Sequence, residues 1–252
     1  MKGIKFTRRM RCSLAVAVFA AFTCGEWAQT PNRASSAPLS LEQIVDQMQK
    51  HDQAQTEKLG GYQALRHYAI KYRGFFKTLD AKMDVEIHYD ASSGKSFRIV
   101  SESGAHTLCE KVFQRAVDSE KEASLAKNAT ALTQANYKFH LIGSETLNGR
   151  PTYILDVEPI APSKFLYKGR IWVDEIDFAV AKMEVQPGKN PSFWISRTSI
   201  HHVNANVGGF WLPHHNRSET KVRIGGTAIM TIDYGTYRIV PRQSRPLASE
   251  LH

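Results

Sequence analysis

Histidines on either side of a short turn are the strongest candidates for chemistry in this sequence. His201 stands before NVGG (206–209) and His214 stands after it. If NVGG closes a tight antiparallel hairpin, residues whose numbers sum to about 415 face each other, which pairs His201 with His214. Two imidazoles can bind zinc, but a zinc site needs a third protein ligand, and no HExxH or paired-cysteine motif provides one. A histidine pair at the surface or rim is therefore favoured over a metal site.

Cysteine and carboxylate chemistry finds little support. Cys109 stands in a stretch of mixed charge with His106 three residues before it, and the chain has no GxSxG motif. A small buried side chain on a helix is favoured over a reactive thiol. The acidic turn of Asp174, Glu175 and Asp177 lacks the glycine and the downstream glutamate of an EF-hand loop, so we expect a solvated hairpin tip. No catalytic residue is assigned, no cofactor is expected, and the chain is not predicted to be an enzyme.

The N-terminal 28 residues are typical of a secretory signal peptide. Basic residues precede the apolar run SLAVAVFAAF, which is too short to remain as a membrane anchor. Lipid attachment at Cys24 is a less favoured alternative, because Phe22 and Thr23 stand where small residues are preferred. Residues 29–40 are rich in Pro, Ser and Ala and predict a flexible linker. We therefore expect an exported protein.

Export changes the charge and the cysteine content. The chain has 33 basic and 24 acidic residues, and loss of five basic residues and Glu26 with the leader leaves 28 against 23, a net charge of about +5. This excess is modest and scattered, so nucleic-acid binding is not expected. Cleavage also removes Cys12 and Cys24, which leaves Cys109 alone and excludes an internal disulfide.

Two stretches have the spacing of amphipathic helices. Ser40 can cap the first, with Gln43 at the capping-box position. The apolar face of this helix is formed by Leu41, Ile44, Val45 and Met48. The second stretch predicts one long helix over 106–135, with a break near Asn128 as the alternative.

Most of the remaining sequence alternates with a period of two. In KMDVEIHYD (82–90), Met83, Val85 and Ile87 share one face, and KSFRIVSES repeats the pattern with Phe97 and Ile99. Further strands are predicted at roughly 136–146, 150–159, 163–174, 178–186, 193–206, 209–222 and 224–239, with turn sequences between them.

A sheet of about ten antiparallel strands tends to curl, and two helical segments cannot cover both of its faces. We therefore expect the helices in the hollow of the curl, as a lid over an apolar cavity. The predicted fold class is α+β, mainly antiparallel β: a curled half-open β-barrel of about ten strands with helices packed in the concave side. One domain is predicted over 41–240, followed by a tail at 241–252.

The aromatic residues leave two interpretations open. They can line a ligand pocket or fill the packed face of the sheet. The residues concerned are Trp172, Phe193, Trp194, Phe210 and Trp211.

Strand and turn sequences in the second half of the chain resemble a known family. GRPTYILDVEPIAPSKFLYKGRIWVDEIDFAVAKMEVQP is similar to the core of the LolA-like proteins, also called outer-membrane lipoprotein-sorting proteins. KNPSFWISRT, GGFWLPHHNRSE and IGGTAIMTIDYGTYRI extend the resemblance, which covers most of 62–240. It implies an incomplete β-barrel with an apolar concave side closed by helices, and binding of an acyl chain or a lipidated protein in the bacterial periplasm.

The leading hypothesis is a periplasmic carrier that shields an acyl chain, with a lipid or lipidated protein as partner and donor and acceptor proteins at the inner and outer membranes. An RseB-like sensor of envelope stress is the alternative, and a metal-dependent hydrolase is less favoured. The predicted cavity residues are Met83, Val85, Ile87, Phe97, Ile99, Leu155, Val157, Ile171 and Val173. The predicted lid residues are Ile44, Val45, Met48 and Val112.

Overall fold

The fold is known from a computed structural model that describes residues 39–125, 130–190, 192–223 and 225–242. These residues belong to one compact unit. The predicted signal peptide (1–28), nearly all of the predicted linker (29–40), the predicted helix break near Asn128 and the end of the predicted tail lie outside the described residues.

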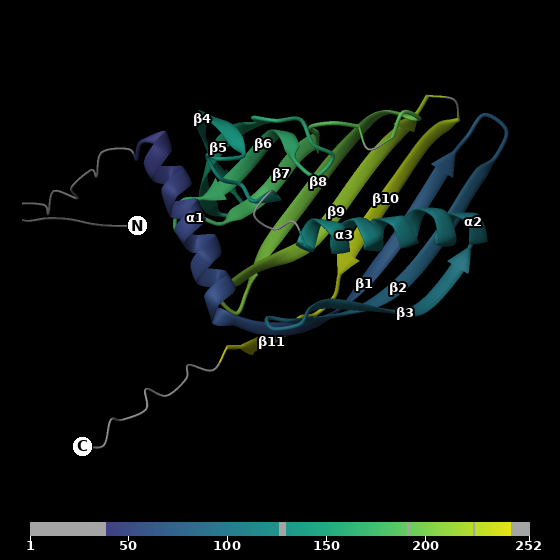
Figure 1. Ribbon diagram of the computed structural model, residues 1–252, viewed down its shortest axis with the longest axis horizontal. Coiled ribbons are helices and arrows are strands. Elements are labelled where there is room, and N and C mark those ends of the chain that lie inside the picture. Colours follow the sequence, from purple (N-terminus) through teal and green to yellow (C-terminus); the bar gives the residue numbers. More distant parts are fainter. Residues whose placement is uncertain (1–38, 126–129, 191, 224, 243–252) are drawn as a thin grey trace, which may run out of the picture. The chain divides into compact units, whose positions relative to one another are not determined.

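One antiparallel sheet dominates the structure (Figure 1). Its strands are β1 (Leu59–Arg73), β2 (Thr78–Asp90), β3 (Gly94–Gly104), β4 (Tyr137–Leu147), β5 (Arg150–Pro159), β6 (Tyr167–Asp174), β7 (Val180–Pro187), β8 (Ile195–Val207), β9 (Phe210–Val222), β10 (Gly226–Tyr234) and β11 (Arg238–Pro241). The spatial order is β3-β2-β1-β10-β9-β8-β7-β6-β5-β4, with β11 paired to β1. Because β3 and β4 are the two edges and do not pair, the curled sheet is a half-open barrel, as predicted.

The period-two pattern of the sequence is confirmed in β2. Ala81, Met83, Val85 and Ile87 are buried, while the residues between them are exposed or partly exposed. The prediction of one strand over 224–239 is wrong, because the chain leaves the sheet after Tyr234 and returns as the short strand β11.

The first helix, α1 (Leu41–Lys58), begins at the predicted capping box. The backbone N–H of Gln43 donates to Ser40 Oγ at 3.3 Å, and the N–H of Ser40 donates to Gln43 Oε1 at 2.8 Å. These two bonds satisfy backbone donors that a helix start leaves unpaired.

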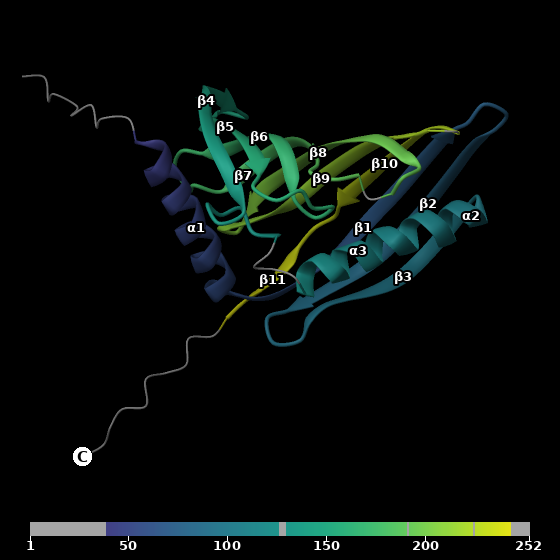
Figure 2. The same cartoon turned by 45° about the horizontal axis from the view of Figure 1, so that its top comes forward.

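The predicted single helix over 106–135 is instead a composite. It comprises α2 (His106–Leu108), a π-helical turn η1 (Cys109–Phe113) and α3 (Gln114–Leu125), and by Tyr137 the chain has entered β4. Apolar spacing does not distinguish a π-turn from a regular helical turn, so this interruption had no signal in the pattern. α2 and α3 lie along the β1–β3 side of the sheet, and α1 lies at the β4–β6 side (Figures 1 and 2).

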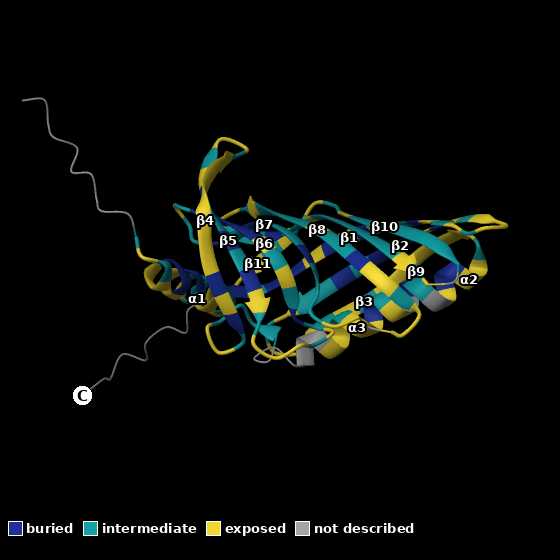
Figure 3. Ribbon diagram, turned by 90° about the horizontal axis from the view of Figure 1, so that it is seen from above, coloured by how far each residue is buried: buried dark blue, intermediate teal, exposed yellow. Residues whose placement is uncertain are grey.

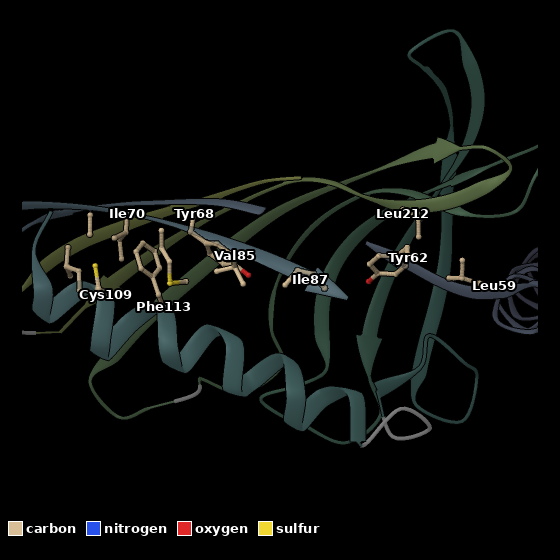
Figure 4. Packing of buried hydrophobic residues seen from close by; sticks show 12 residues of the cluster. Leu59, Tyr62, Tyr68, Ile70, Val85, Ile87, Cys109, Phe113 and Leu212 are labelled. Atoms are coloured by element: carbon tan, nitrogen blue, oxygen red, sulfur yellow. The ribbon is translucent and has the colours of Figure 1, made fainter. Parts of the chain in front are cut away.

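Each helical region covers its own apolar cluster. The first cluster extends along the sheet, in part beneath α2-η1-α3, and comprises Leu59, Tyr62, Tyr68, Ile70, Ala81, Met83, Val85, Ile87, Leu108, Cys109, Phe113 and Leu212 (Figure 4). The second, beneath α1, comprises Ile44, Val45, Met48, Tyr137, Phe139, Leu155, Val157, Leu166, Ile171, Val173 and Val185. By contrast, most of β4 is exposed, including the end of the β4–β5 hairpin that projects from the sheet (Figure 3).

Polar residues separate the two clusters along the sheet. The strand register runs from Tyr68 of the first cluster through Ile232, Asn216, His202 and Met183 to Ile171 of the second. Asn216 Nδ2 lies 3.2 Å from His202 Nδ1. The covered face is therefore two apolar cores with a polar strip between them.

Candidate functional site: an apolar cavity beneath a latched helix

A cavity of about 550 Å³ lies between the helical segment and one end of the sheet. Four parts of the chain line it: the sheet, the helices, the β1–β2 turn and the loop before β8. The lining residues are Ile70, Tyr72, Lys77, Leu79, Thr107, Leu108, Val112, Arg115, Ser192, Trp194, Ile195, Ser218, Thr220, Val222, Ala228 and Met230.

Small side chains explain why this space is open. Ile70 pairs with Met230, and Met230 pairs with Ser218 in the next strand. One step along, Tyr72 pairs with Ala228, and Ala228 pairs with Thr220. The short side chains of Ala228, Ser218 and Thr220 do not fill the layer between β9–β10 and the helix. The hollow is thus encoded by residue size on two neighbouring strands.

An ion-pair cluster around the buried side chain of Arg66 fastens α3 to the sheet; we call it the Arg66 latch, formed by Arg66, Glu120 and Lys95. The Glu120 and Lys95 side chains are 28% and 27% exposed. Arg66 Nη1 and Nη2 lie 2.6 and 3.1 Å from the two carboxylate oxygens of Glu120 in α3. Lys95 Nζ donates to Glu120 Oε1 at 2.7 Å. Only 2% of Arg66 is exposed, and its guanidinium stacks over the ring of Tyr234 at 4.8 Å.

The latch is ionised over the physiological pH range. Burial favours the neutral acid, but the hydrogen bonds and charges of Arg66 and Lys95 outweigh it and lower the pKa of Glu120 to about 2. Burial likewise works against the charge of Arg66, yet Glu120 raises the pKa of the guanidinium above its usual value. Each charge therefore depends on its partner to stay buried.

Sequence reasoning missed the latch, although β1 carried a signal. Tyr62, Ala64, Tyr68 and Ile70 occupy alternating buried positions, and Arg66 stands in the same series. An arginine on the buried face of a strand needs an anionic partner. That partner is 54 positions away on a helix, so the sequence does not identify it.

The predicted cavity and lid residues are divided between the two clusters. Met83, Val85 and Ile87 lie in the first cluster, with Phe97 packed against it, and Val112 lines the cavity. The other predicted residues except Ile99 lie in the second cluster: Leu155, Val157, Ile171 and Val173 with Ile44, Val45 and Met48. Ile99 belongs to neither, and 47% of it is exposed.

The predicted aromatic set is divided as well. Trp194 lines the apolar cavity, and Phe210 packs against the first cluster. Trp172 is buried, with its Nε1 donating to Glu145 at 2.5 Å. Trp194 therefore lines a cavity, whereas Phe210 and Trp172 belong to packed parts of the sheet.

A second cavity of about 690 Å³ lies beside α1 and has mixed polar and apolar walls. Polar residues such as His51, Asp52, Gln55 and Asn204 line it together with apolar residues such as Met48, Leu132, Phe178 and Val180. Gln55 bridges α1 to β9, because its side chain both donates to the carbonyl of Trp211 and accepts from the N–H of Trp211. The walls of this cavity are more polar than those of the first, so the first is the better candidate for an acyl chain.

The predicted histidine pairing is wrong. The hairpin closes with Val207 opposite Phe210, so His201 faces Arg217, and His214 falls where the register shifts beside Val203. Within the described ranges, no group of three His, Cys, Asp or Glu residues is placed to hold a metal ion.

The predicted solvated acidic tip is also wrong for Asp174, which is fully buried. Arg150 donates to both oxygens of Asp174, at 2.5 and 2.7 Å, and to Asp177 at 2.8 Å. Asp177 also accepts from Trp211 Nε1 at 2.9 Å. The acidic turn is therefore a structural junction between β5, β6 and β9.

Cys109 is buried in η1, as predicted, and its thiol contacts the carbonyl of Ser103 at 3.9 Å. Burial raises the pKa of this thiol, which disfavours the reactive thiolate. His106 is exposed and pairs with Glu110 at 3.5 Å.

None of the helices in the described ranges is long and apolar enough to cross a bilayer.

Comparison with known proteins gives structural likeness alone. No family model and no curated protein matches the chain. A Vibrio parahaemolyticus domain described as an outer membrane lipoprotein-sorting protein is 13% identical, covering 82% of this chain and 93% of its own, with a TM-score of 0.41. A DUF1329 family protein from Desulfovibrio piger is 13% identical over 79% and 92%, with a TM-score of 0.39. A LolA superfamily protein from Nitrosomonas europaea is 12% identical over 81% and 94%, with a TM-score of 0.33.

Proposed function

We propose that this chain is a carrier or binding protein that shields the acyl chain of a lipid or lipidated protein in the apolar cavity. The observation that carries the proposal is the cavity of about 550 Å³ with Ile70, Leu79, Val112 and Met230 in its walls. Its volume lies within the range of small-molecule sites. Each methylene moved from water into such walls contributes about 0.8 kcal/mol, so a partly enclosed chain is held by several kcal/mol.

Loading and release require the helical wall to move. Leu108 and Val112 contribute this wall, and the Arg66 latch holds the continuation of the same segment against the sheet. A carrier needs two states of comparable free energy, because a permanently closed site cannot pass on its cargo. In this proposal the latched state retains the acyl chain and the unlatched state exchanges it.

The proposed location and partners rest on the sequence. From the leader-like residues 1–28 and the family resemblance, we propose a domain over 41–240 that acts in the periplasm between membrane donor and acceptor proteins. Sorting of outer-membrane lipoproteins and transport of a lipid are both consistent with an acyl-chain site.

The first test is mass spectrometry of an organic extract. The full chain is expressed with its leader, purified from the bacterial periplasm without detergent, and compared with a soluble protein of the same size. We expect stoichiometric phospholipid or acylated peptide. A clean extract, together with no binding of an added fluorescent fatty acid, would overturn the proposal.

A cavity-filling variant locates the site. Ala228→Phe places a large side chain into the hollow and is expected to weaken binding of the fluorescent fatty acid at least tenfold. Thr231→Phe is the matched control, because Thr231 lies on the same strand, one residue beyond Met230, and points to the other face. Equal affinity of both variants would place the acyl chain elsewhere.

A further inference from the structure

Exposed aromatic side chains gather at one end of the sheet. In the turn between β1 and β2, Phe75 is 82% exposed and Phe76 is fully exposed, at 102%. In the loop before β8, Phe193 is 74% and Trp194 57% exposed. Large apolar side chains at this level of exposure are unfavourable in water, and adjacent pairs of them on loop tips mark a contact surface.

Shared cavity walls and hydrogen bonds connect these two aromatic pairs around the mouth of the cavity. Lys77, which closes the β1–β2 turn by accepting from the N–H of Gly74 at 2.9 Å, lines the cavity, as does Trp194. The N–H of Arg223 donates to the carbonyl of Trp194 at 2.8 Å, and the Tyr72 hydroxyl donates to the carbonyl of Gly225. The β1–β2 and β9–β10 turns lie together at the α2 end of the sheet (Figures 1 and 2).

The strand ends and loops at this mouth are rich in basic residues. The segments 71–79, 187–199 and 220–229 contain seven lysines and arginines and no aspartate or glutamate. Lys77 and Arg223 are exposed. The Arg223 guanidinium lies 5.1 Å from the centre of the Phe193 ring, which places a positive charge directly beside an apolar tip.

We propose that this end of the molecule docks on the surface of an anionic phospholipid bilayer. Aromatic side chains favour the interface between headgroups and hydrocarbon, and neighbouring basic residues are attracted to anionic headgroups. The four aromatic residues insert at the headgroup level while Lys77 and Arg223 contact phosphate. Docking goes beyond acyl-chain binding and does not require it, although it brings the cavity mouth to the lipid surface.

The test is flotation of the full periplasmic chain with vesicles of phosphatidylcholine alone and of phosphatidylcholine with phosphatidylglycerol. We expect at least tenfold stronger partition onto the anionic vesicles, falling as salt is added. Phe75→Ser/Phe76→Ser and Lys77→Glu/Arg223→Glu are each expected to lower this partition at least fivefold. Equal partition onto both vesicles, or none onto either, would overturn the proposal.

The matched control removes exposed apolar residues elsewhere. Ile176 is 62% and Val240 59% exposed, away from the mouth, so Ile176→Ser/Val240→Ser is expected to leave partition unchanged. If this control lost as much partition onto vesicles as Phe75→Ser/Phe76→Ser, the binding would be unspecific and the proposed docking surface would be wrong. Neither Phe75 nor Phe76 lines the cavity, so fatty-acid binding by Phe75→Ser/Phe76→Ser reports separately on the proposed function.

Discussion

At the scale of single residues, the Arg66 latch is the most consequential feature of the covered face. A guanidinium that is almost fully buried is tolerated because Glu120 supplies two hydrogen bonds and a neutralising charge. Removing one partner of such a pair destabilises the fold more than replacing both partners with apolar residues, because the remaining charge stays buried without compensation.

Glu120→Gln is therefore expected to lower the free energy of unfolding by about 3–5 kcal/mol. Glu122→Gln is the matched control on the same helix: Glu122 pairs with Lys164 at 3.0 Å, but 57% of its side chain is exposed. An exposed pair contributes about 1 kcal/mol or less. Urea denaturation measures the free energy of unfolding of both variants. An equal decrease in the two would show that the latch contributes no more than an exposed ion pair.

Asp174 is a second buried charge that depends on its partner, here at the junction of β5, β6 and β9. Burial favours its neutral form, yet the hydrogen bonds from Arg150 and from the backbone N–H groups of Asp177 and Ile176 lower its pKa. We expect Asp174→Asn to destabilise the fold by about 3 kcal/mol, because Arg150 loses its bidentate carboxylate. Glu175→Gln, next to it in the sequence and without a hydrogen bond to Arg150, is the control for urea denaturation.

At the scale of elements, the latch gives α3 a pH dependence through the partly buried carboxylate of Glu120. The folded-state pKa of Glu120 is about 2, below its usual value of 4.5. A depressed pKa contributes stability that is fully present above the usual pKa and is lost as pH falls toward the folded-state value. The contribution of Glu120 is therefore complete above about pH 4.5 and declines between pH 4.5 and about 2.

Hydrogen exchange measures this directly. Between pH 5 and pH 3, amides of α3 are expected to lose more protection than those of α1, after correction for intrinsic exchange rates. Glu120→Gln removes the titrating group and is expected to abolish the excess loss. Parallel loss in both helices of the unmodified protein would contradict a local effect of the latch.

The elements also show what the sequence could predict. The alternation of Met83, Val85 and Ile87 predicts their shared buried face, and Ser40 with Gln43 predicts the start of α1. The β8–β9 register could not be predicted from the sequence, because it depends on the geometry of the Gly208-Gly209 turn and on a bulge at Val203/Asn204. Asn204 donates to the Val180 carbonyl at 2.7 Å from a neighbouring strand, a contact outside the local pattern.

At the scale of the whole molecule, the same limit divides the candidate site. Alternation shows which residues share a face of a strand, but it does not show which helix lies over them. Met83 and Ile171 were predicted to line one hollow, yet Met83 packs beneath η1 and Ile171 beneath α1. The order of the strands separates these residues into two cores. Because β1 pairs with β10, β2 and β6 lie toward opposite edges of the sheet.

The more apolar of the two cavities shares Ile70 and Leu108 with the first cluster, which leads to a prediction that distinguishes the two clusters. Phe113 in the first cluster and Ile44 in the second are both fully buried, so Phe113→Ala and Ile44→Ala are each expected to cost about 2–5 kcal/mol of unfolding free energy. Phe113 belongs to the same cluster as Ile70 and Leu108, which line the cavity, so we expect its truncation to enlarge the apolar space there. Phe113→Ala is therefore expected to shift the preferred fluorescent fatty acid toward longer chains.

Ile44→Ala serves as the control of similar cost, with fatty-acid preference expected to stay as in the unmodified protein. Titration with a series of chain lengths, at a temperature where both variants remain folded, separates ligand preference from stability. A shift caused by Ile44→Ala would mean that the acyl chain reaches the core beneath α1. An acyl chain that crosses His202 and Asn216 would remove water from these polar groups, which is unfavourable. Such a result would therefore contradict the division of the covered face by the polar strip.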